Sequence, residues 1–288
     1  MAHPEPAGRP VTLGFSPCPN DTFIFHALVH GLVAEPGLPP LLPRLEDVET
    51  LNRLALEGEL DVSKVSYGAL PHLLDDYVLL RSGGALGRGC GPLLVAREPL
   101  SRQALRTGRI AIPGRYTTAN LLLRLWDPEL PPGEETVYSE IMPRVAAGEV
   151  DAGLIIHESR FTYPEHGLVR LEDLGEWWER VTGLPIPLGG IVARRSLGAE
   201  TVAALDHAIR ASVRHAFARP GDSEEYVRAH AQEMEESVRR SHIELYVNDF
   251  SLTLGLEGER AVQVLLDRAA RAGLTGRGAE STPGAGTA

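Results

Sequence analysis

One order of segments occurs twice along this chain of 288 residues, and it limits the fold to two units of similar design. The first copy opens with the apolar run Val11–Phe15 and the second with Arg109–Pro113, and each run leads through a loop into a segment typical of a capped helix. Later in each copy a helical run ends at glycine, and a Glu-apolar-Asp turn leads into a short apolar strand, at 57–67 and at 147–157. Strands that alternate with helices form sheets covered by helices. We therefore expect an α/β chain with two lobes.

Two segments are expected to connect the lobes. The glycine-rich run 83–91 lies between predicted strands and no helix follows it, so it is neither a P-loop nor a dinucleotide-binding loop. The apolar segment 188–193 is typical of a return crossing. We predict a discontinuous first lobe of residues 1–95 and 193–272, a second lobe of residues 96–192 and a flexible tail at 273–288.

Charge and composition exclude several classes of protein. Hydrophobic residues make up 43% of the chain and the formal net charge is −11, which fits a soluble globular protein. The sequence shows no basic stripe, so we expect no nucleic-acid or membrane partner, and no apolar run approaches the roughly 18 residues that span a bilayer. Two cysteines are too few for a disulfide scaffold, and the start MAHPEPAGRP has neither a basic nor an apolar signal region. We therefore expect a cytoplasmic protein that binds a small molecule.

The loop after the first strand is rich in groups that contact ligands. Two prolines stiffen the segment Ser16–Thr22, and the side-chain oxygens of Asn20, Asp21 and Thr22 are suited to cap the helix that follows. In a parallel α/β sheet a strand-to-helix loop of this kind lies at the carboxyl edge, where ligands bind. A capped turn without a ligand is the alternative, and we favour a site.

Lys64 is the only lysine among 28 basic residues. Lysine carries a compact, titratable ammonium on a flexible stem, whereas arginine presents a planar fork. A lysine kept in an arginine-rich chain is a candidate for a role that arginine cannot take, with chance retention as the alternative. Lys64 lies in the strand segment of the first copy of the repeated pattern, which favours a functional role.

His157 follows the predicted strand 154–156 at the carboxyl edge of the second lobe. Histidine is the side chain best suited to exchange a proton near neutral pH, and a packing role is the alternative. Thr117 and Thr118 open a predicted helix, and the amides and hydroxyls at a helix start bind carboxylates and phosphates, although simple capping needs only one threonine. Ser66 offers the same chemistry from the first lobe.

Metal-binding patterns are weak in this sequence. His26 and His30 have the spacing of two ligands on one helix, but no third ligand is evident, so we expect ordinary helix residues. Cys18 and Cys90 have no cysteine cluster around them. We therefore expect no metal and no cofactor, and proton chemistry on a small anion is the class of reaction that remains.

Six segments carry a resemblance to a known enzyme family: 16–23, 45–52, 64–67, 81–89, 114–118 and 153–163. Over about residues 11–272 the chain resembles the 1,4-dihydroxy-6-naphthoate synthases, the cyclic dehypoxanthine futalosine lyases of the futalosine pathway of menaquinone biosynthesis. The resemblance implies a cytoplasmic enzyme with the two-lobed, type II fold of periplasmic binding proteins and an active site in the cleft between the lobes. It also implies a cofactor-independent lyase that releases 1,4-dihydroxy-6-naphthoate and a sugar-derived fragment.

Position by position, the resemblance implies that His157 is the catalytic base. The substrate-binding positions that it implies are Lys64, Val65, Ser66, Thr117, Thr118 and Asp21. Two alternatives stay open. One is a solute-binding protein without turnover, against which the missing export signal argues. The other is a chorismate dehydratase of the same pathway, against which the motif beginning at Ser16 argues.

Overall fold

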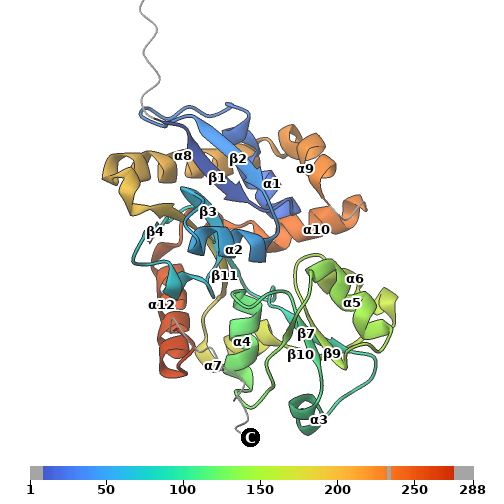
Figure 1. Cartoon of the computed structure of the whole chain (residues 1–288). Helices are drawn as coiled ribbons and strands as arrows, with labels where there is room; N and C mark the ends of the chain where they lie inside the picture. The colour runs from blue at the N-terminus through green and yellow to red at the C-terminus, as the bar shows by residue number, and fades with distance from the viewer. Residues whose placement is uncertain (1–8, 232–234, 276–288) are drawn as a thin grey trace, which may run out of the picture.

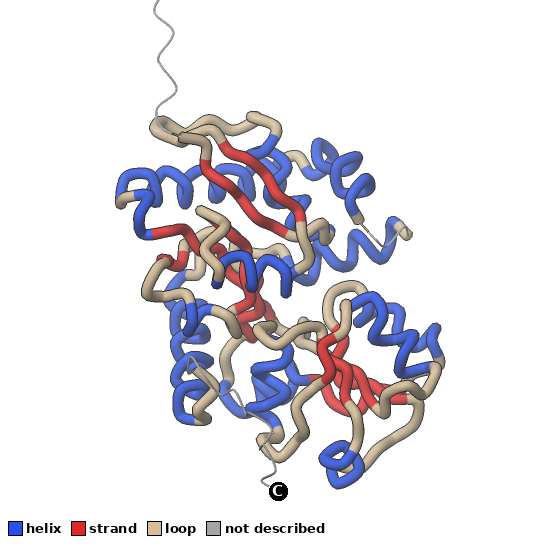
Figure 2. The backbone as a smooth tube through the Cα atoms, viewed as in Figure 1, coloured by secondary structure: helices blue, strands red, loops and turns tan. Residues whose placement is uncertain are grey.

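The computed structural model describes residues 9–231 and 235–275, and its strands form two separate sheets (Figures 1 and 2). The first sheet has the order β2-β1-β3-β11-β4, with β5 also paired to β11. β1 runs parallel to β2 and β3, whereas β11 runs antiparallel to its neighbours. The strands of this sheet are β1 (Val11–Phe15), β2 (Leu41–Leu45), β3 (Val62–Ser66), β4 (Tyr77–Leu79), β5 (Ala85–Gly87) and β11 (Ile186–Arg194).

The second sheet has the order β10-β6-β9-β7-β8 and repeats the parallel core of the first. β7 runs parallel to β8 and β9, and β6 is antiparallel to β9 and β10. Its strands are β6 (Leu93–Ala96), β7 (Ile110–Ile112), β8 (Glu134–Glu135), β9 (Ala152–Ile155) and β10 (Val169–Asp173). The prediction of two α/β lobes from the repeated pattern is confirmed.

Helices cover both sheets (Figure 1). Those near the first sheet are α1 (Pro19–Val29), α2 (Val48–Leu56), α8 (Ala199–Ala218), α9 (Glu224–His230), α10 (Glu236–Tyr246), α11 (Asp249–Leu252) and α12 (Gly255–Arg271). Those of the second lobe are α3 (Arg102–Thr107), α4 (Thr118–Trp126), α5 (Tyr138–Ala146), α6 (Ser159–Thr162) and α7 (Leu174–Thr182). Short 3-10 turns are η1 (Leu70–His72), η2 (Tyr163–His166), η3 (Arg195–Leu197) and η4 (Pro220–Ser223). Among the described helices, none is long and apolar enough to cross a bilayer.

The chain changes sheet earlier than the expected lobe boundaries. β6 pairs with β9 and β10, so the second sheet has begun by residue 93, and the whole of β11 belongs to the first sheet. The boundaries expected after residues 95 and 192 therefore fall inside β6 and β11. The physical reason is that the glycine-rich run is not a single loop, because β5 forms within it and pairs with β11. Most of the expected tail, from residue 276 onward, lies outside the described residues.

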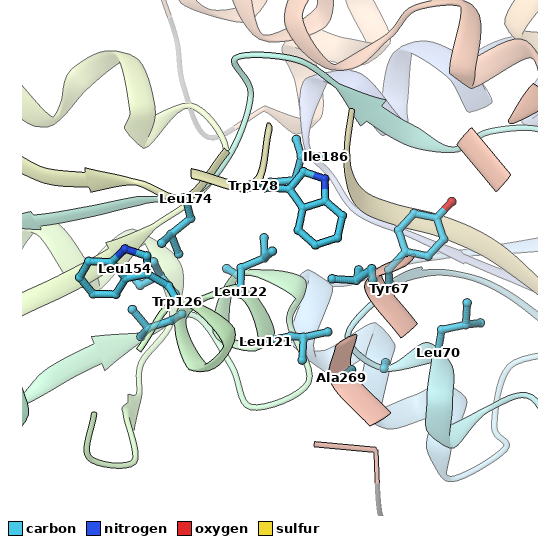
Figure 3. Close-up of a cluster of buried hydrophobic side chains, with 14 of the residues drawn as sticks. Tyr67, Leu70, Leu121, Leu122, Trp126, Leu154, Leu174, Trp178, Ile186 and Ala269 are labelled. Atoms are coloured by element: carbon cyan, nitrogen blue, oxygen red, sulfur yellow. The ribbon is translucent and has the colours of Figure 1, made fainter. Parts of the chain in front are cut away.

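The two lobes share a hydrophobic core. One cluster of buried side chains includes Tyr67 after β3, Leu122 on α4, Trp178 on α7 and Leu265 on α12. In Figure 3, Leu122 and Trp178 lie between Leu154 on one side and Tyr67 on the other. Trp178 is fully buried, and its indole N–H donates to the carbonyl of Pro185 at 3.0 Å. Apolar packing therefore joins the two lobes.

Candidate active site

A pocket lies between the lobes, where strands of both sheets end. Ser16 follows β1, Ser66 ends β3, and His157 comes shortly after β9. All the residues expected at the site line this pocket: Asp21, Lys64, Val65, Ser66, Thr117, Thr118 and His157. Lining residues that were not singled out from the sequence include Val48, Leu51, Leu188, Gly189 and Tyr246. Val48 and Leu51 lie in segment 45–52, which carries the resemblance, and Leu188 and Gly189 lie in the expected return crossing. No role was expected for them, because an apolar side chain or a glycine does not by itself mark a binding residue.

Asp21 lies inside the first turn of α1 rather than at its cap. The helix begins at Pro19, whose ring already has the φ of a first helical residue, and Cys18 is the N-cap residue. The Asp21 carboxylate instead accepts hydrogen bonds from the Ser16 hydroxyl at 2.7 Å and from Asn20 Nδ2 at 2.9 Å. The predicted side-chain cap of this helix is therefore wrong, and Asp21 is free to face the pocket.

Lys64 is paired with Asp21 within the pocket wall. Its Nζ lies 3.2 Å from Asp21 Oδ1 and donates to the carbonyl oxygen of Gly83 at 2.6 Å. Only 5% of Lys64 is exposed. Because Asp21 already balances the ammonium, Lys64 does not present an uncompensated positive charge to a ligand. The compact ammonium fits between the carboxylate and the glycine-rich run, where a planar guanidinium has less room.

Ser66 is held by α2 through Asn52. The Ser66 amide donates to Asn52 Oδ1 at 2.8 Å, and Asn52 Nδ2 donates to Ser66 Oγ at 3.2 Å. The hydroxyl oxygen is therefore used as an acceptor, and its hydrogen is available to a ligand. Val65 packs into the shared hydrophobic core, so we expect it to meet a ligand through its backbone.

Thr117 and Thr118 place the start of α4 against the first lobe. The Thr117 hydroxyl donates to Gly114 O at 2.8 Å and accepts from Asn120 N at 3.2 Å, which makes it the N-cap. The Thr118 hydroxyl donates to Leu188 O at 2.6 Å and accepts from Gly68 N at 3.1 Å. Both hydroxyl hydrogens are therefore committed to carbonyl groups. The groups left for an anion are the first backbone amides of α4, which have no acceptor within the helix.

Glu49 on α2 makes a second polar contact between the lobes, which sequence reasoning missed. Its carboxylate accepts from the amide of Tyr116 at 3.2 Å and from Asn52 Nδ2 at 3.1 Å. Burial raises the pKa of Glu49 to about 7, although these hydrogen bonds oppose the rise. The sequence offers no local signal for this contact, since Tyr116 lies 67 residues further along the chain.

His157 has the backbone conformation of a strained site residue. Its φ is +56°, and it is the only residue other than glycine with positive φ in the described part of the chain. Such a conformation is costly for a side chain with Cβ and is concentrated at functional sites. Burial lowers the pKa of His157, with the neighbouring Glu158 opposing the effect. The imidazole is therefore neutral at pH 7 and ready to accept a proton.

Four further polar side chains surround His157: Cys18, Tyr138, Glu158 and His242. The ring of Tyr138 lies 5.1 Å and that of His242 6.0 Å from the His157 ring, centroid to centroid. Sequence reasoning missed Tyr138 and His242 in this role because they reach His157 only in the folded chain. It also gave no role to Glu158, although Glu158 is the next residue in the sequence.

One trio of these side chains has the donor types that zinc prefers. Cys18 Sγ, a ring nitrogen of His157 and a carboxylate oxygen of Glu158 lie within 4.8 Å of one another. Zinc needs a thiolate, and burial together with the Glu158 charge raises the pKa of the Cys18 thiol. This disfavours the trio as a zinc site. His26 and His30, the other candidate pair, pack with each other and with Tyr226 instead of lining the pocket.

Comparison with known proteins supports the fold and gives the family. The alkanesulfonate-binding protein from Xanthomonas axonopodis superposes with a TM-score of 0.66 over 94% of this chain and 95% of its own, at 15% identity, which shows the two-lobed fold of periplasmic binding proteins. A crystal structure of a protein from Archaeoglobus fulgidus is 35% identical, with a TM-score of 0.86 over 92% of this chain and 98% of that chain.

Two curated relatives carry one name, 1,4-dihydroxy-6-naphtoate synthase. The relative from Thermus thermophilus is 60% identical over 91% of this chain and 94% of its own length. The relative from Streptomyces coelicolor is 54% identical over 91% of this chain and 93% of its own length. The profile of the family described as menaquinone biosynthesis matches residues 11–271. The chain, with its pocket between two α/β lobes, therefore belongs to the menaquinone biosynthesis family of enzymes.

Proposed function

We propose that this enzyme is a cofactor-independent carbon–carbon lyase that converts cyclic dehypoxanthine futalosine into 1,4-dihydroxy-6-naphthoate. The proposal rests on the name shared by the two curated relatives and on the pocket that this chain forms. The observation that carries the mechanism is His157, a strained and neutral imidazole at the wall of that pocket.

His157 acts as the general base in this proposal. It takes a proton from the substrate, and the electron pair left behind drives a retro-aldol type cleavage of the bond between the ring system and the sugar-derived part. The ring system becomes aromatic as the bond breaks, which provides the driving force. The electron pair of the broken bond leaves the released ring system as an anion, which takes the proton back from His157, so the imidazole is neutral again at the end of the cycle.

Two other parts of the pocket bind and orient the substrate. The first amides of α4, beside Thr117 and Thr118, receive the aryl carboxylate, because a helix start with free amides favours an anion. The Ser66 hydroxyl donates from the first lobe. The Lys64–Asp21 pair is nearly neutral as a whole, so it serves as a polar hydrogen-bonding surface rather than as a free cation.

The shared core and the polar contacts between lobes support an enclosed reaction. An enclosed site keeps water away from the anionic intermediate and strengthens the hydrogen bonds to it. We propose a small aryl carboxylate as the binding partner and the cytoplasm as the place of action.

The test is incubation of the purified protein with cyclic dehypoxanthine futalosine, with and without EDTA, and detection of 1,4-dihydroxy-6-naphthoate by mass spectrometry. Equal product in both samples supports a metal-free lyase. Binding without product supports a solute-binding protein, and the absence of both directs the next assay to chorismate. Product that EDTA abolishes contradicts the cofactor-independent mechanism.

A further inference from the structure

Two buried polar residues from opposite lobes meet behind His157. Glu158 follows His157 in the second lobe, and His242 lies on α10 beside the first sheet. His242 is fully buried and Glu158 is 7% exposed. Glu158 Oε2 lies 3.7 Å from His242 Nδ1, and neither atom has a hydrogen-bond partner among the described residues. Buried polar atoms without partners are costly, so this pair needs an explanation.

The hydrogen bonds of Asn20 decide which nitrogen of His242 carries a hydrogen. Asn20 Nδ2 donates to Asp21 Oδ1 at 2.9 Å, because a carboxylate can only accept. The amide oxygen of Asn20 is therefore the atom that faces His242 Nε2, at 2.9 Å. An amide oxygen also only accepts, so Nε2 must be the donor. In a neutral His242 the remaining nitrogen, Nδ1, is then a bare acceptor.

If His242 is neutral and Glu158 is ionised, Nδ1 and Oε2 are two buried acceptors that face each other without a hydrogen between them, which is unfavourable. One proton between them removes this conflict. We infer that Glu158 and His242 share one proton across the lobe interface and that this pair positions His157 for its role as base. The inference rests on the proposed function insofar as His157 is the base, whereas the shared proton stands on the geometry alone.

The pair affects His157 through both charge and position. An ionised Glu158 next to His157 favours the protonated imidazole, which cannot act as a base. A proton held on the pair makes Glu158 and His242 neutral as a unit and leaves His157 free of its proton. The ring of His242 also lies nearly parallel to that of His157, at an interplanar angle of 17°. Because the two partners come from different lobes, this arrangement exists only when the lobes are together.

Other ionisable groups face these three residues from every element packed against them. They are Cys18, Asp21, Asp47, Tyr138, Arg160 and Tyr246. Burial raises the pKa of Cys18, Tyr138 and Tyr246, so these three stay protonated near neutral pH. Asp21 is paired with Lys64. Asp47 caps α2, and Arg160 is paired with Asp173. Each of these groups therefore has its own partner or keeps its proton, unlike Glu158 Oε2 and His242 Nδ1.

The first measurement is independent of activity. Long-range ¹H–¹⁵N correlation of labelled histidine rings in the full-length protein reports which ring nitrogens carry or share hydrogen. We expect His242 Nε2 to carry a hydrogen and Nδ1 to show a shared one, with no free-imidazole titration between about pH 5.5 and pH 8.5. A bare Nδ1, or a hydrogen on Nδ1 with a bare Nε2, overturns the shared proton.

The second measurement compares two substitutions of Glu158. Glu158→Gln offers an N–H donor to Nδ1 and is neutral, so it imitates the protonated pair. Glu158→Ala leaves Nδ1 without a partner. We expect Glu158→Gln to keep kcat within about threefold and Glu158→Ala to lower kcat about tenfold or more with little change in KM, since an unsatisfied buried acceptor is costly. The matched control is His215→Ala, which removes a histidine–carboxylate pair with Asp222 outside the pocket and should leave kcat unchanged.

These results separate the inference from the proposed function. If the unaltered enzyme makes no 1,4-dihydroxy-6-naphthoate, the proposed function fails, and the ring spectra still test the pair. If the unaltered enzyme is active and Glu158→Gln loses as much kcat as Glu158→Ala, the positioning role is wrong.

Discussion

The two walls of the pocket differ in how fully their polar groups are satisfied. On the wall from the first lobe, Asp21, Lys64 and Ser66 are held by one another or by neighbours through hydrogen bonds and an ion pair. On the wall from the second lobe, His157 has a strained backbone, and Glu158 beside it has an unpartnered oxygen. On the first wall the polar groups already have hydrogen-bond or ion-pair partners. On the second wall at least one polar atom gains a partner only from a proton or a substrate. The comparison teaches that two lobes built from a repeated pattern contribute unequally, because the base comes from the second lobe alone, whereas groups that bind the substrate come from both.

The largest effect should follow from removing the base on the reactive wall. His157→Asn removes the imidazole but tolerates positive φ, since asparagine adopts this conformation more readily than most residues. We expect kcat to fall about 100-fold or more, as loss of a general base commonly does, while the protein stays folded. Steady-state kinetics measure the fall and circular dichroism checks the fold. Turnover near the original rate would show that His157 is not the general base.

On the wall from the first lobe, we expect removal of the Lys64 ammonium to lower the free energy of unfolding more than it lowers turnover. Lys64→Met leaves Asp21 buried with an uncompensated charge, and loss of one partner of a buried pair costs about 3–5 kcal/mol. Denaturant unfolding measures this loss. The double variant with Asp21→Asn should recover part of it, because the unpaired charge is gone. Unchanged stability of Lys64→Met would show that the pair is not formed.

The two threonines at the start of α4 allow a finer comparison. Thr118→Val removes a hydroxyl that joins Gly68 N to Leu188 O, and we expect a loss of about 1–3 kcal/mol, since both partners are left unsatisfied. Thr117→Val removes only a helix cap, worth about 1 kcal/mol. Unfolding of both variants under the same conditions measures the difference. Equal losses would contradict the role of Thr118 as a contact between lobes.

The smallest effect concerns pH and Glu49. The pKa of Glu49 is raised in the folded state to about 7 from an ordinary value of 4.5, so the folded protein holds the proton more tightly than the unfolded chain. Stability from this group is therefore full below about pH 4.5 and is lost as the pH rises through about 7. Glu49→Gln should remove this decline, which amounts to on the order of 1 kcal/mol between pH 6 and pH 7. Parallel stability curves for the two proteins between pH 5 and pH 8 would sink this prediction.

Much of the fold was accessible from the sequence because it repeats. The strand, loop and helix order around Val11–Phe15 and Arg109–Pro113 predicted two α/β lobes, and the structure has them. The boundaries were less accurate, because pairing of β5 with β11 depends on residues about a hundred positions apart.

The site was predictable where a local motif marked it. His157 and Thr117 follow β9 and β7 of the second sheet, and strand ends of one sheet meet at one edge. Lys64 lies within β3 of the first sheet and was marked by being the one lysine. The residues that complete the site carry no such mark. Asn20 and His242 are 222 positions apart, and their hydrogen bond exists only because α1 and α10 pack together. Which hydroxyls are free to bind an anion is also a property of the fold, as the committed hydroxyls of Thr117 and Thr118 show.

The burial of the one lysine in this sequence has a practical consequence. Reagents that acylate the side-chain amine of lysine have one target in this sequence, Lys64. In the folded enzyme Lys64 is enclosed, so it should react slowly. The rate of acylation at Lys64 then depends on how often its ammonium becomes accessible to solvent. Mass spectrometry of the one peptide that contains Lys64 therefore measures how often this part of the folded chain opens.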